Sequence, residues 1–167
     1  KNAIETGSNS IVKLTADIEI STTLTVSRAV TLDLNGNVLK RTDTGRVIEV
    51  QNNGNLTLTD STPSATHSFK VDESTKLWIL DKTNGTNTVN GGVITGGTGT
   101  DLSTYGGTTW YCGGGALIKN GGSLTMRGGN IIGCSAECGG GVCIDSEQGQ
   151  FSMSGGSIAG CVASDIG

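Results

Sequence analysis

The sequence GGGALIKNGGSLTMRGGNIIGC at residues 113–134 returns as GGGVCIDSEQGQFSMSGGSIAGC at residues 139–161. The offset is 26 residues at the first glycines and becomes 27 after one inserted residue. Each copy holds three short apolar runs separated by glycine-containing turns. Self-similarity at about 20–50 residues is typical of solenoids and propellers, in which each repeat packs on the next.

An earlier copy of the pattern, over residues 48–58, aligns with residues 116–126 at an ungapped offset of 68. Alternate residues of each strand point inward and meet the same position one coil away, about 4.8 Å distant. We therefore predict a parallel β-helix with three short strands per coil and glycine-rich corners. The predicted interior columns are Ile48/Ala116/Val142, Val50/Ile118/Ile144, Leu56/Leu124/Phe151 and Leu58/Met126/Met153.

The first half of the chain is built differently, since residues 1–90 hold 5 glycines and residues 91–167 hold 23. Its Thr-, Val- and Ile-rich runs alternate at period two, which indicates half-buried strands. We expect one β-helix domain over 1–167. Because the repeat stops at a position that would expose an unpaired sheet edge, we also expect that the chain is part of a longer protein. The parts of the domain are N-terminal coils (1–61), a β-hairpin insertion (62–90) and glycine-rich coils (91–167) with a loop insertion at 97–112.

Composition excludes several classes of protein. The chain is 34% hydrophobic and 4% aromatic, with one proline and a net charge of −4. No apolar run approaches the roughly 20 residues of a transmembrane helix, and the regular alternation argues against disorder and helical bundles. The mild negative charge, without a Lys/Arg cluster, argues against a nucleic-acid partner.

Several segments resemble the right-handed β-helix domains of bacterial cell-surface and secreted proteins, in the pectate-lyase-like superfamily. They are VKLTADIEI at 12–20, LDLNGNVL at 32–39, GNLTLTDS at 54–61, and the two Gly-Gly-x-Ile-x-Gly segments that end in Cys134 and Cys161. The resemblance implies an all-β, right-handed fold and a secreted or cell-surface location, but fold alone does not imply activity. The position of Cys134 and Cys161 is usually Asn in such repeats, so a stack of sulfur atoms is expected there instead.

Five cysteines occupy positions 112, 134, 138, 143 and 161. Equivalent positions on adjacent coils lie within disulfide range, and export would allow oxidation. Two interpretations stay open: a disulfide, at Cys112–Cys138 or Cys134–Cys161, or a stack of reduced, buried thiols. The spacing predicts no metal site, because Cys134 and Cys138 have no second pair at a set distance and His67 is remote.

The few aromatic residues gather in the two insertions. Tyr105, Trp110 and Tyr111 lie in the insertion at 97–112, and Trp78 lies in the other. Exposed rings stack on sugars and anchor ligands, so these four are the candidate ligand-binding residues. Alternatively, they cover the flank of the solenoid, which alternation favours for Trp78. Leu117 and Cys143 point outward by alternation and predict a small apolar patch, either covered by an insertion or used as a contact surface.

The acidic residues do not recur at the repeat offset, so we predict no catalytic residues and no cofactor. The sequence favours a non-catalytic adhesin or stalk module that contacts a polysaccharide or a surface glycan. One alternative is a polysaccharide lyase or glycoside hydrolase, because acids distant in sequence can converge on a groove along one sheet. The other alternative is a purely structural spacer.

Overall fold

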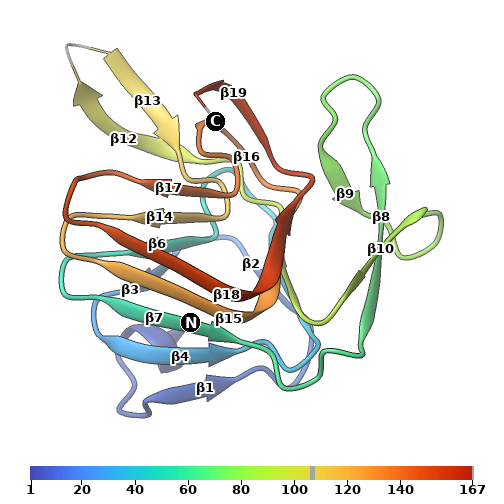
Figure 1. Ribbon diagram of the computed structural model, residues 1–167, viewed down its shortest axis with the longest axis horizontal. Helices are drawn as coiled ribbons and strands as arrows, with labels where there is room; N and C mark the ends of the chain where they lie inside the picture. The colour runs from blue at the N-terminus through green and yellow to red at the C-terminus, as the bar shows by residue number, and fades with distance from the viewer. Residues whose placement is uncertain (106–107, 167) are drawn as a thin grey trace.

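Short runs rich in Val, Ile, Leu and Thr form the strands, because branched side chains suit a pleated, half-buried surface. The computed structural model describes residues 1–105 and 108–166. For residues 100–105, 108, 109 and 166 it describes the backbone but not the side chains. Apart from the four-residue helix α1 (Asn2–Glu5), the described elements are strands. The parallel sheets curl into a half-barrel around a shared apolar interior (Figure 1).

The largest sheet has eight strands in two rows, which the long strands β15 (Ser123–Ile132) and β18 (Gln150–Ala159) join. β15 pairs with one row through residues 123–126 and with the other through residues 130–132. One row contains β1 (Ile11–Lys13), β4 (Ala29–Asp33) and β7 (Asn55–Thr59), and the other contains β2 (Ile18–Ile20), β5 (Val38–Arg41) and β11 (Val93–Thr95). A second parallel sheet contains β3 (Leu24–Val26), β6 (Ile48–Val50), β14 (Ala116–Ile118) and β17 (Val142–Ile144).

The predicted columns are confirmed as register partners between neighbouring strands. Ala116 pairs with Ile48 on one side and Val142 on the other, and Leu124 pairs with Leu56 and Phe151. The two remaining columns pair in the same way. Most of these side chains are buried in one continuous cluster. Repeat spacing therefore determines which residues share the interior.

The last members of two columns are more exposed than an interior position implies. Ile144 is 45% exposed and Met153 is 43% exposed. They belong to β17 and β18, which lie at the ends of their rows among the described strands. Burial in a stacked fold needs a neighbour on both sides, so an inward direction alone does not bury these two side chains.

The segment predicted as a hairpin insertion forms an antiparallel sheet beside the parallel ones (Figure 1). Its strands are β8 (Thr66–Val71), β9 (Trp78–Leu80) and β10 (Asn87–Asn90). β8 pairs with β9 as expected, and β10 adds a third strand along the other edge of β8. A second, small core forms between this sheet and the parallel one, from Phe69 and Val89 on one side and Val93 of β11 and Ile132 of β15 on the other.

The expected loop at 97–112 is instead a second hairpin, so that part of the prediction is wrong. β12 (Thr100–Tyr105) pairs antiparallel with β13 (Thr108–Cys112), and Thr-rich alternation explains the strands. β13 continues in parallel to β16 (Ser135–Cys138) and then β19 (Val162–Ile166).

The outward patch at Leu117 and Cys143 is covered at Leu117, which has 0% exposure. Gly113, with φ +65°, turns back across it, and a Cβ on Gly113 would lie 2.9 Å from the Leu117 Cβ. The chain entering β14 therefore buries a residue that alternation directs outward. Cys143, on the next strand, is half-buried.

Candidate functional site

Trp110 and Tyr111, two of the aromatic residues expected to form one binding surface, do not lie on the same face of the structure. Tyr111 is 49% exposed, whereas Trp110, its neighbour on β13, is half-buried. Successive side chains of a strand point to opposite faces, so the two rings do not share one surface. The side chain of Tyr105 lies outside the described residues.

Trp78 is half-buried and packs against the small core around Phe69. Its ring centroid lies 6.4 Å from that of Phe69, and a Cβ on Gly160 would collide with the Trp78 ring. The Trp78 backbone N–H also donates to the Gly160 carbonyl at 2.9 Å. Trp78 thus attaches the β8–β9 hairpin to the repeat.

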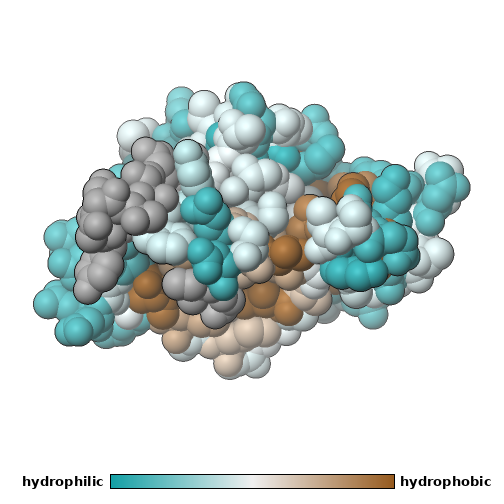
Figure 2. Space-filling model, turned by 90° about the horizontal axis from the view of Figure 1, so that it is seen from above, coloured by the Kyte–Doolittle hydropathy of each residue, from teal (hydrophilic) through white to brown (hydrophobic). Residues whose placement is uncertain are grey.

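Tyr111 forms one wall of a groove of about 390 Å³ between the β8–β9 connection and strands β13, β16 and β19. Figure 2 shows the molecule from above, with apolar surface lying between hydrophilic side chains. The groove is lined by Thr75, Leu77, Thr98, Tyr111, Ser135, Ala136, Glu137, Val162 and Ser164. Among the described side chains, one tyrosine ring, one carboxylate and four Ser or Thr hydroxyl groups therefore surround one hollow.

Two local interactions hold the groove walls. The Glu137 carboxylate accepts the Tyr111 backbone N–H at 2.9 Å, which ties β16 to β13. On the opposite wall, hydrogen bonds from Ser74 and Thr75 lower the pKa of Asp72 to about 2. The charged Asp72 thus orders the connection that carries Thr75 and Leu77 into the groove.

The two predicted cysteine pairs lie close together, and all five cysteines are free thiols. Cys112 and Cys138 are register partners on β13 and β16. Cys134 is completely buried, and its Cys161 neighbour together with that burial raises the Cys134 pKa well above its usual value. Cys134 and Cys161, at equivalent positions of the two repeat copies, thus lie beside each other.

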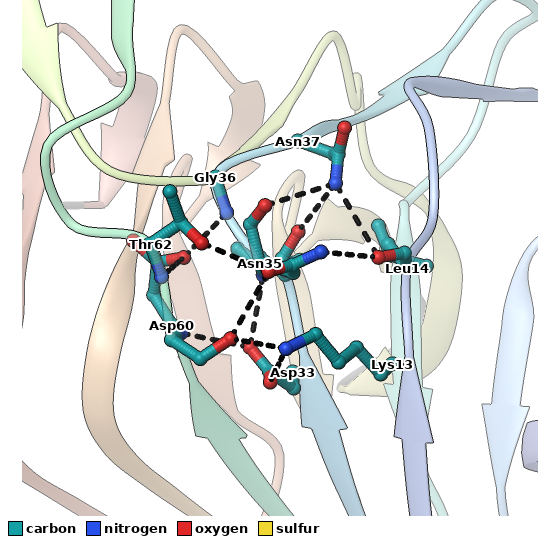
Figure 3. A network of polar contacts seen from close by, with 10 residues as sticks. Lys13, Leu14, Asp33, Asn35, Gly36, Asn37, Asp60 and Thr62 are labelled. Atoms are coloured by element: carbon teal, nitrogen blue, oxygen red, sulfur yellow. Dashed lines mark hydrogen bonds and ion pairs between the residues drawn. The ribbon is translucent and has the colours of Figure 1, made fainter.

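A polar cluster fills the corner after β4, where Asn35 and Gly36 form a tight turn with φ of 49° and 73° (Figure 3). The Asp33 carboxylate accepts the backbone N–H groups of Asn35 and Ser61, both at 2.9 Å. Asp60 accepts from Gly36 at 2.6 Å and from Gly92 at 2.8 Å. Asp33 and Asp60 do not recur at the repeat offset, but the fold brings them to one corner, where their carboxylates accept backbone N–H groups.

Asp33→Asn is expected to lower the free energy of unfolding by about 1–2 kcal/mol at pH 7, because a neutral oxygen accepts two N–H groups less strongly than a carboxylate. Burial raises the Asp33 pKa, but the hydrogen bonds from Ser61 and Asn35 and the charge of Lys13 outweigh it, so the net pKa is lowered. A carboxylate whose pKa is lower in the folded state stabilises that state at pH values above its unfolded-state pKa of about 4. This stabilisation is lost as the pH falls through the folded-state pKa.

Urea denaturation of both proteins between pH 7 and pH 3 tests this, and the gap between them should narrow below about pH 4. Asp145→Asn is the matched control, since Asp145 is exposed. A gap that stays constant over the whole range would show that the Asp33 charge contributes nothing.

Among the residues that the structure describes, no group of three or more His, Cys, Asp or Glu side chains is placed to hold a metal ion. His67 lies with Nε2 2.9 Å from the Gly36 carbonyl, far from the thiols in the sequence and engaged with the polar corner. Within the described part of the chain, no helix has the length and apolar character needed to cross a membrane.

The fold and the groove together define an all-β repeat protein of stacked parallel sheets with an aromatic-walled groove at one end. No family model matches the chain, and no curated protein or solved structure matches it either.

Proposed function

We propose that the chain is a right-handed parallel β-helix module of an exported bacterial surface protein, and that it binds glycans without cleaving them. The parallel register of the columns supports this fold, because each repeat copy places the same position beside its neighbour. The resemblance of residues 12–20 and 32–39 to pectate-lyase-like domains supports the surface location.

The observation that carries glycan binding is the half-exposed Tyr111 ring at the wall of the groove. Sugar rings present apolar C–H faces that stack on an aromatic ring, while their hydroxyls need hydrogen-bond partners around the rim. Glu137 supplies acceptors, and Ser135 and Thr98 supply hydroxyl groups. This combination also favours a binding module over a spacer, which needs no such groove.

The non-catalytic part of the proposal rests on what the converging acids do. Hydrolysis needs two carboxyl groups that face the substrate, one as acid and one as base or nucleophile. Asp33 is 8% exposed, and backbone N–H groups occupy both its carboxylate and that of Asp60. These two acids stabilise a corner away from the groove, and among the described side chains that line the groove one, Glu137, carries a carboxylate.

Tyr111→Ala is expected to weaken binding to the glycans that the wild type selects on an array by about tenfold or more, as loss of an aromatic anchor does. Tyr111→Phe should retain most of the affinity, because the ring face remains. Ile11→Ala, which removes a 63% exposed apolar side chain at the other end of the molecule, is the control.

The same glycans are assayed in parallel for chain shortening. Cleavage by the wild type would overturn the non-catalytic proposal, and binding that Tyr111→Ala leaves unchanged would exclude the groove as the site. An array on which the wild type binds nothing would favour the spacer.

A further inference from the structure

Two cysteines directly follow the groove residues Tyr111 and Glu137 and lie opposite each other on neighbouring strands. Cys112 of β13 and Cys138 of β16 are register partners in a parallel pair, and Gly113 N donates to the Cys138 carbonyl at 3.0 Å. Neighbouring strands lie about 4.7–4.9 Å apart, which falls within the Cα separation of about 4.4–6.8 Å that a disulfide spans. The Cα separation expected for this pair therefore allows a disulfide.

The surroundings of the two thiols differ. Cys112 is 7% exposed, while Cys138 is half-buried. Burial and the neighbouring Cys138 raise the pKa of Cys112 to about 12. Cys143 also contacts Cys112 and competes for it, but Cys143 lies on β17 and not on a strand paired with β13.

We propose that Cys112 and Cys138 are a disulfide site, and that a small-molecule disulfide such as oxidised glutathione converts them from thiols to a covalent staple between β13 and β16. The more accessible Cys138 thiolate attacks one glutathione sulfur and releases one glutathione thiolate. The Cys112 thiolate then attacks the Cys138 sulfur and releases the second. Two protein thiols lose two protons and two electrons, and one oxidised glutathione becomes two reduced molecules.

The staple acts on the groove because Tyr111 and Glu137 immediately precede the two cysteines. The Tyr111 backbone N–H already donates to the Glu137 carboxylate and so joins β13 to β16 at the groove. A covalent bond one residue away fixes the separation of the aromatic ring and the carboxylate. Oxidation thus preorganises the groove, a consequence that rests on the proposed function.

The test is to incubate the folded protein in a glutathione redox buffer, block free thiols with an alkylating agent, and map the peptides. Trypsin cleaves after Lys119 and Arg127, and a glutamyl endopeptidase cleaves after Glu137 and Glu147, which separates Cys112, Cys134 and Cys161. Fragmentation spectra distinguish Cys138 from Cys143 on their shared peptide. We expect a Cys112–Cys138 link and a rise in Tm of about 5–10 °C relative to the reduced protein.

Cys138→Ser should abolish both the link and the rise in Tm, whereas Cys143→Ser and Cys161→Ser should retain both. A link mainly between Cys112 and Cys143, or five alkylated thiols after oxidation, would overturn the proposal. These readouts need no glycan, so a failure of the proposed function leaves them intact. Where glycans bind, the oxidised protein should bind about threefold more tightly, and equal affinity in both states would disprove the effect on the groove.

Discussion

Leu56→Ala is expected to lower the free energy of unfolding by about 3–4 kcal/mol, a large part of the stability of a domain of this size. Leu56 has 0% exposure and lies in the centre of a column, with Val30 and Leu124 as its register partners on the two neighbouring strands. The parallel backbone ladders fix the distance between these strands. The surroundings therefore cannot collapse to fill the space that the lost side chain leaves.

Urea denaturation followed by circular dichroism measures the loss, and Thr57→Ala is the matched control. Thr57 lies on the same strand and pairs with Thr31 and Thr125, but it points outward and is only half-buried. We expect the control to lose less than about 1 kcal/mol. Equal losses for the two variants would contradict the inward assignment of Leu56 and, with it, the columns.

The columns could be predicted from sequence because a repeat fixes register by its length alone. Once residues 48–58 align with residues 116–126, every inward position follows from alternation. The segment GGVITG at 91–96 resembles GGNIIG at 128–133 in the same way, and Val93 and Ile94 pair with Asn130 and Ile131. The turn at Asn35 and Gly36 was predictable for a local reason, since those two residue types tolerate positive φ.

The candidate site could be predicted only in part. The sequence identified Tyr111 by its residue type, but the opposite wall of the groove comes from Thr75 and Leu77, in an insertion with no repeat to align. Glu137 was missed because a single acid in a repeat carries no pattern. Its place directly before Cys138, opposite Tyr111 before Cys112, was the available evidence.

The burial of residues near the corners could not be predicted from the sequence either. Leu117 is covered because the Gly113 corner crosses it, and alternation within a strand says nothing about the path of a corner. Asp33 and Asp60 meet for a similar reason: the loop after β7 packs on the turn after β4, although neither residue recurs at the repeat offset. Periodicity describes the strands, while the corners follow from contacts between segments of unrelated sequence.

Corners are also where the second large effect is expected. Gly97→Ala should lower the free energy of unfolding by at least about 3 kcal/mol, because a Cβ at this position would overlap the Gly114 carbonyl oxygen and lie 2.9 Å from Val47 Cγ2. The Gly114 carbonyl cannot move aside freely, since it accepts the Val47 N–H at 3.0 Å. The Gly97 carbonyl is engaged as well, by the Ser135 N–H at 2.8 Å.

Gly128→Ala is the matched control, because its φ is not positive and the nearest atom to its Cβ would be Asp60 N at 3.1 Å. Urea denaturation of both variants should show a loss of about 1 kcal/mol or less for the control. Similar losses of unfolding free energy at the two sites would mean that glycine is needed here only for its backbone flexibility and not for its lack of a side chain. A loss confined to Gly97 would mean that the repeat copies approach so closely at this corner that no side chain fits between them.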